Sequence, residues 1–284
     1  MNKQFFILPL LLIGVTGCND DEEPGSGNAE GNYPATAFTK IQLSEVSPYE
    51  PGAPAVTTTQ TYSFSNGLLT DYTTLQNYTV INEKVEIKNN TTVNYNDREV
   101  TVTDDAGNVS TYTLNDDGYA VKCIRQETGT TRTYTFSYLI NTENKYYLEN
   151  ITESINEGEV YASIEIDYNA DRALRITQKV DAYEQLYTAT TPADNEIANL
   201  SEIPCLFLTE LYPLTLHSAA LYGKLLGEPF HALITEIIPD GNAESNETVS
   251  YTYQTNAQGI ITSCTVVTNS YGTKYSRTVN YVIQ

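Results

Sequence analysis

The chain of 284 residues has no tryptophan, two histidines, and only 15 basic residues against 36 acidic ones. The resulting net charge is −21 at pH 7. Phosphate backbones repel a chain of this charge, so nucleic acid is excluded as a partner. The sequence also lacks any apolar run close to the roughly 20 residues that a transmembrane helix requires. These absences leave an acidic protein that is not expected to cross a membrane as a helix.

Cysteine is scarce and has no metal or redox spacing. Three cysteines follow Cys18, at Cys123, Cys205 and Cys264, and no C-x-x-C pair occurs. This excludes a zinc ribbon and a thioredoxin-type motif. Three thiols cannot all pair, so we expect mostly buried free thiols, with Cys123 and Cys264 in strands. A single disulfide is the alternative.

The two histidines, His217 and His231, show no His-Glu-x-x-His pattern and no second pair of ligands at metal spacing. We therefore interpret each as a core or surface residue and predict neither a metal nor a cofactor. A Gly-x-Ser-x-Gly nucleophile turn is also missing. We predict no catalytic residues.

The N-terminal residues have the features of a secretion signal. A short segment with one positive charge, Lys3, precedes an apolar run of 11 residues, 5–15. That run has the length of a signal-peptide core. It ends in Val15-Thr16-Gly17-Cys18, which resembles the lipobox of bacterial lipoproteins. We predict a signal peptide over residues 1–17 and lipid attachment, with palmitate-type acyl chains, at Cys18. The lipid anchors the protein to the outer membrane, since two or more acyl chains hold a protein stably.

A tether follows the lipidated cysteine, over residues 18–35. Four consecutive acids, at 20–23, precede a stretch rich in glycine, serine and asparagine. Such a composition buries no apolar area and favours a flexible, extended segment. The acid run resembles the surface-export signal of lipoproteins from the Bacteroides group, which implies the extracellular face. Simple solvation of an acidic segment is the alternative.

Residues 36–284 are predicted to form one β-rich domain. Strands with tyrosine or phenylalanine at alternate positions recur, as in 132–138, separated by turns such as Asn66-Gly67. Alternation of period two indicates antiparallel strands with one buried and one solvated face. Open sheets of more than about ten strands curl or split. We predict a mainly β fold: a long antiparallel meander, strongly curved or partly closed.

Residues 193–233 interrupt the alternation and are predicted to be helical. Asp194 is a candidate cap for a helix that ends near Pro204. A second helix is expected over Leu214–Leu226, with Gly227 as its C-cap. We expect this helical segment to cover the apolar concave face of the sheet.

The tyrosine hairpins and the segment Leu221-Tyr222-Gly223-Lys224-Leu225-Leu226-Gly227 resemble a family of uncharacterised surface lipoproteins from gut Bacteroides species. The resemblance implies a porin-like curved meander and carries no catalytic residues. Insertion in a membrane as a barrel is not expected. The alternate face of the strands carries Thr, Ser, Asn and Glu, whereas a lipid-facing band must be apolar.

Two groups of acidic residues were considered for chemistry. Glu149, Glu153, Glu157 and Glu159 surround one strand and turn. Paired carboxylates hydrolyse glycosides, but at this spacing we expect a solvated face. Residues 104–108 and 115–118 resemble fragments of calcium loops without the closing glutamate, and are interpreted as turns.

The sequence therefore predicts a lipid-anchored, non-catalytic binding or accessory module at the cell surface. A glycan or a peptide is the candidate ligand, and an outer-membrane transporter is the candidate partner. Two alternatives stay open: a secreted glycosidase or other hydrolase that uses carboxylates, and a periplasmic structural or assembly factor that binds a partner or lipophile inside the curve of the sheet.

Overall fold

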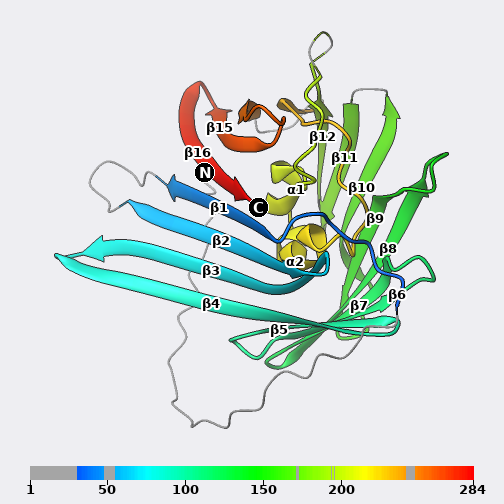
Figure 1. The fold of residues 1–284 in the computed structure, drawn as a ribbon. Helices are drawn as coiled ribbons and strands as arrows, with labels where there is room; N and C mark the ends of the chain where they lie inside the picture. Colours follow the sequence, from blue (N-terminus) through cyan, green and yellow to red (C-terminus); the bar gives the residue numbers. More distant parts are fainter. Residues whose placement is uncertain (1–30, 48–54, 171–172, 193, 195, 241–246) are drawn as a thin grey trace.

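The chain folds into a closed antiparallel barrel. The computed structural model describes residues 31–47, 55–170, 173–192, 194, 196–240 and 247–284. Sixteen strands in this part of the chain pair in sequence order, and β1 pairs with β16 to close the ring (Figure 1). The predicted meander is confirmed, and its closure is complete instead of partial.

The strands, in chain order, are β1 (Lys40–Ser47), β2 (Val56–Ser65), β3 (Leu68–Val80), β4 (Glu83–Asn96), β5 (Glu99–Asp104), β6 (Val109–Leu114), β7 (Ala120–Glu127), β8 (Thr130–Ile140), β9 (Tyr146–Ile155), β10 (Val160–Ala170), β11 (Ala173–Val180), β12 (Tyr183–Thr190), β13 (Glu236–Pro239), β14 (Thr248–Thr255), β15 (Ile261–Ser270) and β16 (Thr273–Ile283).

Closure follows from the two terminal strands. Leu43 of β1 lies opposite Tyr281 of β16, and both side chains are buried. Left apart, each strand would expose a row of unpaired backbone groups beside an apolar face. Pairing satisfies these groups and completes the core.

Turn chemistry sets the hairpin register. Asn66 and Gly67 join β2 to β3 with φ of 51° and 80°. Two successive residues at positive φ define the type I′ turn that Asn-Gly favours, so this prediction is confirmed. Along β8, Tyr134 and Phe136 are buried whereas Thr135 and Ser137 are exposed, as period-two alternation requires.

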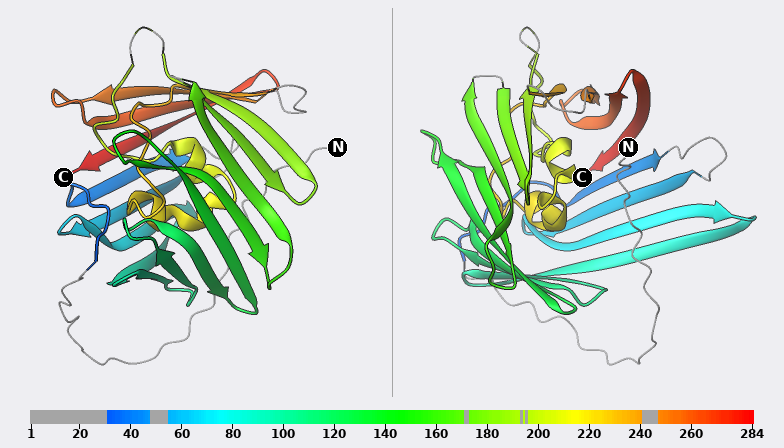
Figure 2. Two further views of the ribbon diagram at one scale, coloured as in Figure 1. Left: turned by 90° about the vertical axis from the view of Figure 1, so that its right-hand side faces the viewer. Right: turned by 180° about the vertical axis from the view of Figure 1, so that it is seen from behind.

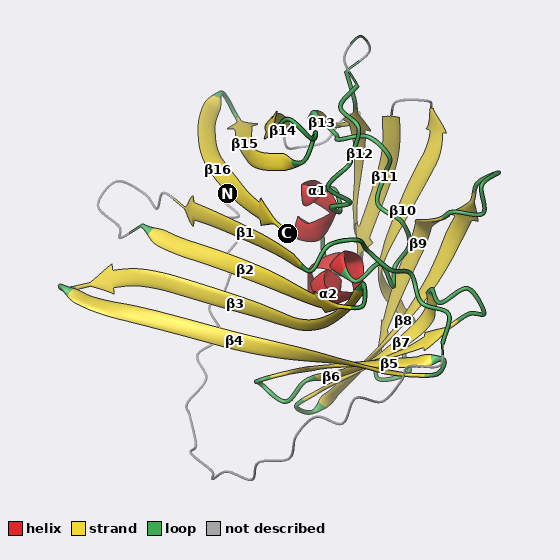
Figure 3. Ribbon diagram, in the orientation of Figure 1, coloured by secondary structure: helices red, strands yellow, loops and turns green. Residues whose placement is uncertain are grey.

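Residues 196–234, which we call the plug, fill the inside of the barrel (Figures 2 and 3). They contain three short helices: α1 (Leu206–Glu210), η1 (Leu214–His217, a 3₁₀ turn) and α2 (Ser218–Tyr222). Their side chains share one apolar cluster with the inward faces of the strands. The expectation that the insertion covers the concave apolar face is confirmed. None of these helices has the length and hydropathy to cross a membrane.

The helices are shorter than predicted. No helix begins at Asp194, which lies in a bend, and Ala198 instead forms a β-bridge with Ala232. The side chain of Asn199 bonds the backbone of Ile203, and this local bond competes with a helix. The second helix ends at Tyr222 with Gly223 as its cap, not Gly227.

Lys224 explains the early end of that helix. Its φ is 58°, outside the helical region, and its ammonium group is buried between Glu202 at 3.0 Å and Glu228 at 3.3 Å. A buried cation requires such partners. The ion pairs therefore hold the backbone in a turn where the apolar pattern predicts a helix.

The barrel has two different ends. One end, which we call the closed end, carries the turns β2/β3, β4/β5 and β6/β7 and is crossed by residues 31–39, which we call the strap. The strap bonds two of these turns through Thr36 N–H to Gly67 O (3.0 Å) and Tyr33 OH to Asp97 O (2.6 Å). The opposite end, which we call the open end, carries the turns β1/β2, β3/β4 and β5/β6.

Candidate binding site

Polar side chains occupy the inward face of three neighbouring strands on the open-end side of the apolar core. Strand register places Arg125 of β7 opposite Arg132 of β8, and Tyr134 opposite Glu153 of β9. Along its strand, each of these four residues lies one or two inward-facing positions away from a buried apolar residue, such as Ile151 in β9. The polar residues therefore form a layer above the core, beside η1 and the end of α1.

Glu153 is the centre of this layer and is fully buried, at 0% exposure. One of its carboxylate oxygens accepts hydrogen bonds from Arg132 (2.6 Å), Tyr212 (2.7 Å) and Tyr134 (3.2 Å). Arg132 also pairs with Glu127 at 2.9 Å. A buried carboxylate with a guanidinium and two phenol donors is stably held, and the other oxygen of Glu153 has no partner among the described residues.

Glu127 links the two arginines of the layer, with Arg125 at 2.7 Å and Arg132 at 2.9 Å. Burial acts to raise the pKa of Glu127, but the hydrogen bonds and charges of the two guanidinium groups outweigh it and lower this pKa. Asp104 lies 3.5 Å from Arg125 and completes the ion-pair network. Two guanidinium groups and three carboxylates are thus joined in one network, with one acid in excess.

His217 lies under this layer and is buried. Its Nδ1 is 2.7 Å from the Tyr112 hydroxyl, and its ring packs edge-on against Tyr134 and Phe136. Burial, and then the positive charge of Arg125, lower the pKa of His217 to about 3. It is a neutral core histidine, one of the two expected options. His231 is exposed, 3.7 Å from Glu196.

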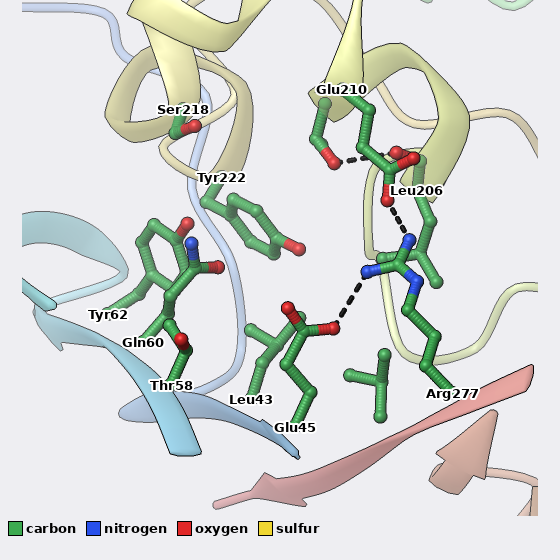
Figure 4. A pocket seen from close by; sticks show the side chains of 12 residues that line it. Leu43, Glu45, Thr58, Gln60, Tyr62, Leu206, Glu210, Ser218, Tyr222 and Arg277 are labelled. Atoms are coloured by element: carbon green, nitrogen blue, oxygen red, sulfur yellow. Dashed lines mark hydrogen bonds and ion pairs between the residues drawn. The ribbon is translucent and has the colours of Figure 1, made fainter. Parts of the chain in front are cut away.

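A pocket of about 140 Å³ opens between the plug and the strands β1, β2 and β16 (Figure 4). Its lining residues are Leu43, Glu45, Thr58, Gln60, Tyr62, Leu206, Thr209, Glu210, Ser218, Tyr222, Arg277 and Val279. The pocket lies on the open-end side of Tyr62, which stacks between Tyr72 (4.6 Å) and Tyr222 (3.9 Å). The stacked rings form a rigid floor.

Arg277 forms one wall of the pocket together with two carboxylates. Its guanidinium bonds Glu45 at 2.7 Å and also pairs with Glu210 of α1 (Figure 4). This wall joins β1, β16 and the plug. Two acids against one base leave it with no free cation to attract an anionic ligand.

The opposite wall comes from three alternate positions of β2. Thr58 and Gln60 make no side-chain hydrogen bond to any residue that the structure describes, and the buried Tyr62 hydroxyl makes none of regular geometry. Thr58 and Gln60 are half-buried, whereas the Tyr62 hydroxyl is buried near Tyr72 and Ser218. A hydroxyl and an amide without a partner in the described part of the chain therefore line one pocket beside a buried phenol.

The four glutamates that the sequence analysis considered do not share one environment. Glu149, Glu157 and Glu159 are exposed, as expected for a solvated face. Glu153 does not belong to that face, and its expected solvation is wrong. Its position shows why: Glu153 shares the period-two parity of the buried Ile151, so alternation aims it inward.

The cysteines are free thiols in this part of the chain. Cys123 and Cys264 lie in β7 and β15, as predicted, and both are buried. Burial raises the pKa of Cys123 and Cys264 to about 12 and that of Cys205 to about 11. Such thiols are unreactive at neutral pH. Cys18 and the signal peptide lie outside the described residues.

The two candidate calcium-loop fragments are turns. Asp104 Oδ1 accepts the backbone N–H groups of Ala106 and Asn108, and Asn115 Oδ1 accepts those of Asp117 and Tyr119. Their oxygens stabilise the hairpins. Within the described ranges, no three His, Cys, Asp or Glu side chains are grouped for a metal ion.

The fold and the pocket define a closed antiparallel barrel with an internal plug. A family model described as "Domain of unknown function (DUF4595) with porin-like fold" matches residues 63–263. The chain belongs to this family, which confirms the resemblance noted in the sequence.

One solved structure supports this assignment. A porin-like protein from Bacteroides uniformis is 55% identical, with a TM-score of 0.84 over 89% of this chain and 99% of that one. A porin-like protein from Bacteroides vulgatus is 14% identical, with a TM-score of 0.29 over 86% and 97%. No curated protein matches the chain.

Proposed function

We propose that this protein is a non-catalytic carbohydrate-binding module held at the extracellular side of the outer membrane by a lipid on Cys18. One observation carries the proposal: alternate residues of β2 line one pocket, where the side chains of Thr58 and Gln60 have no hydrogen-bond partner among the described residues and Tyr62 forms the floor. Sugar hydroxyls donate and accept at once, so hydroxyl and amide side chains complement them.

The pocket also sets limits on the ligand. At about 140 Å³ it is smaller than the roughly 300–1,000 Å³ of a drug-sized site, so it admits the end of a glycan and not a whole oligosaccharide. Its paired Arg277 favours a neutral sugar over an anionic one. A peptide is the runner-up ligand.

The outer surface of the barrel supports tethering over insertion. Lys122, Glu165 and Arg175 are exposed on the outward faces of β7, β10 and β11. A lipid-facing barrel carries an apolar band, and charges on that face are costly. The acyl chains on Cys18 then supply the membrane affinity. An outer-membrane transporter is the candidate partner that would receive the captured sugar.

The pocket gives little support to the hydrolase alternative. Glu45 and Glu210 both accept hydrogen bonds from Arg277. Glycoside hydrolysis requires one carboxylic acid that donates a proton to the leaving group. Two carboxylates that share one guanidinium do not meet this requirement.

Glycan-array binding of the lipidated full-length protein tests the proposal, followed by calorimetry on the best ligand. The double variant Thr58→Val/Gln60→Met should weaken binding by about 10- to 100-fold, since each hydrogen bond contributes roughly 1 kcal/mol. The control Thr59→Val/Thr61→Val changes the opposite face of β2 and should bind within about twofold of the wild type.

Two results would overturn this function. If the two double variants bound the ligand with equal affinity, the pocket would not be the binding site. Release of new reducing ends by the wild-type protein would favour the hydrolase. Labelling with radioactive palmitate tests the anchor, and a Cys18→Ser variant should incorporate none.

A further inference from the structure

The strap is built into the closed end of the barrel and does not merely pass over it. Asn32, Tyr33 and Thr36 bond three successive turns, at Asp116 O (3.4 Å), Asp97 O (2.6 Å) and Gly67 O (3.0 Å). The Tyr33 ring packs edge-on against Tyr95 at 4.9 Å. The chain therefore enters the barrel at one defined end.

The plug holds the strap from inside. Lys224, whose side chain is 7% exposed, donates to the Ala35 carbonyl at 3.3 Å while it pairs with Glu202 and Glu228. Glu202 in turn accepts a hydrogen bond from the Thr36 hydroxyl at 2.8 Å. An ion cluster around the buried Lys224 thus joins the plug to the strap.

The closed end leaves little room between the strap and the turns. A Cβ added to Gly118 would lie 2.1 Å from Asn32 O, and one added to Gly67 would lie 2.8 Å from Thr36 O. Both glycines are needed for this close approach as well as for their positive φ. The strap contact is a specific feature of this end.

The reach of the tether is short compared with the barrel. Thirteen residues, 19–31, separate Cys18 from Asn32. If the segment is flexible, as its composition predicts, its end-to-end distance is about 20 Å. The 11 residues of β8 span about 36 Å at the usual rise of a strand. The tether therefore favours one end of the barrel near the lipid.

We infer that the strap orients the molecule, with the closed end toward the membrane that holds the lipid and the open end, with its pocket, away from it. The inference rests on the lipid anchor of the proposed function. It adds an interaction surface: the closed end faces the membrane, and ligand reaches the pocket from the far side.

Energy transfer from the protein to headgroup-labelled lipids in vesicles tests the orientation. Single cysteines are placed at exposed turns of the closed end, Thr142→Cys or Gln258→Cys, and of the open end, Glu83→Cys or Thr128→Cys. Cys123 and Cys264 are buried, Cys205 is half-buried, and the pKa values of all three thiols are raised, so a dye attaches to the new cysteine. Transfer should be at least twofold higher from both closed-end positions.

Two further variants separate the strap from the tether. Tyr33→Ala/Thr36→Ala loosens the strap at unchanged tether length and should reduce the difference between the ends. Twenty Gly/Ser residues inserted after Glu30 should lower transfer from the closed end, because the end-to-end distance grows to about 30 Å.

The outcomes are distinguishable. Equal or reversed transfer from vesicle-bound protein would overturn the orientation and leave the anchor intact. An unchanged difference in the loosened-strap variant would also overturn it. Failure of the wild-type protein to sediment with vesicles would reject the lipid anchor and the orientation together.

Discussion

The two ends of the barrel use the same turn residues in different surroundings. Gly107, Gly129 and Gly272 turn the chain at the open end with φ of 79°, 77° and 82°, and a Cβ at any of them would meet no atom within 4 Å. At the closed end, Gly67, Gly118 and Gly259 have φ of 80°, 87° and 79°, yet a Cβ would lie 2.8, 2.1 and 2.9 Å from the strap or plug.

This contrast separates local from tertiary requirements. A glycine at positive φ satisfies the hairpin in both places. Only the closed end adds a neighbour that excludes a side chain. The open end instead carries the pocket and the ion pairs of the polar layer. One end is therefore closely packed, and the other holds the pocket.

The largest effect is expected in the polar layer. Glu153→Ala removes the buried carboxylate that Arg132, Tyr134 and Tyr212 share and should lower the free energy of unfolding by about 3–5 kcal/mol. Urea unfolding measures this loss. Glu149→Ala, on the outward face of the same strand, is the control and should change stability by less than about 0.5 kcal/mol. Similar losses in both variants would mean that the layer does not stabilise the barrel.

A pair of glycine variants isolates the strap contact. Gly107→Ala should cost about 1 kcal/mol, because only its positive φ is strained. Gly118→Ala has the same strain but also displaces the strap, so we expect a loss of about 3 kcal/mol. Unfolding midpoints compare the two, and limited proteolysis near Tyr33 should speed up only in Gly118→Ala. Equal losses would contradict a specific closed end.

His217 should make the barrel sensitive to acid. Its pKa in the folded protein, about 3, lies below the usual value of about 6.5. As the pH falls below 6.5, His217 is therefore protonated in the unfolded chain but stays neutral in the folded protein. Stability is therefore lost between pH 6.5 and 3. The free energy of unfolding that is lost through His217 amounts to about 2 kcal/mol between pH 7 and 5.

A His217→Gln variant should lose that part of the pH dependence, measured by urea unfolding at both pH values. His231→Gln, at the exposed histidine, should keep it. A wild-type slope that persists in His217→Gln would assign the acid sensitivity to other groups.

The architecture was largely readable from the sequence, because it depends on local signals. Alternation of aromatic and hydroxyl residues in 132–138 and the Asn66-Gly67 turn each specify a hairpin within a few residues. A meander needs little more. The length of the helices was overestimated. The apolar spacing in 214–226 does not reveal that ion pairs with Glu202 and Glu228 hold Lys224 in a turn.

The polar layer and the pocket depend on three-dimensional pairing. In β7 the apolar Ile124 faces outward and the charged Arg125 faces inward, opposite to the usual pattern. A register shift between Thr113 and Leu114 precedes this strand. Thr58 and Gln60 look like ordinary surface residues until α1 and β16 close a pocket over them. No local signal marks Thr58 and Gln60 as pocket residues, whereas the alternation of β9 does place Glu153 inward.

The pairing of β1 with β16 brings the start and the end of the barrel together. Thr39 N–H donates to the carbonyl of Gln284 at 2.6 Å, so the two chain segments touch at the closed end. Every other strand pair joins two strands that are consecutive in the sequence. A circular permutant that links Gln284 to Lys40 and opens the chain at an open-end turn would thus keep every strand pair. A reporter fused to Gln284 would lie on the strap side and leave the pocket unobstructed.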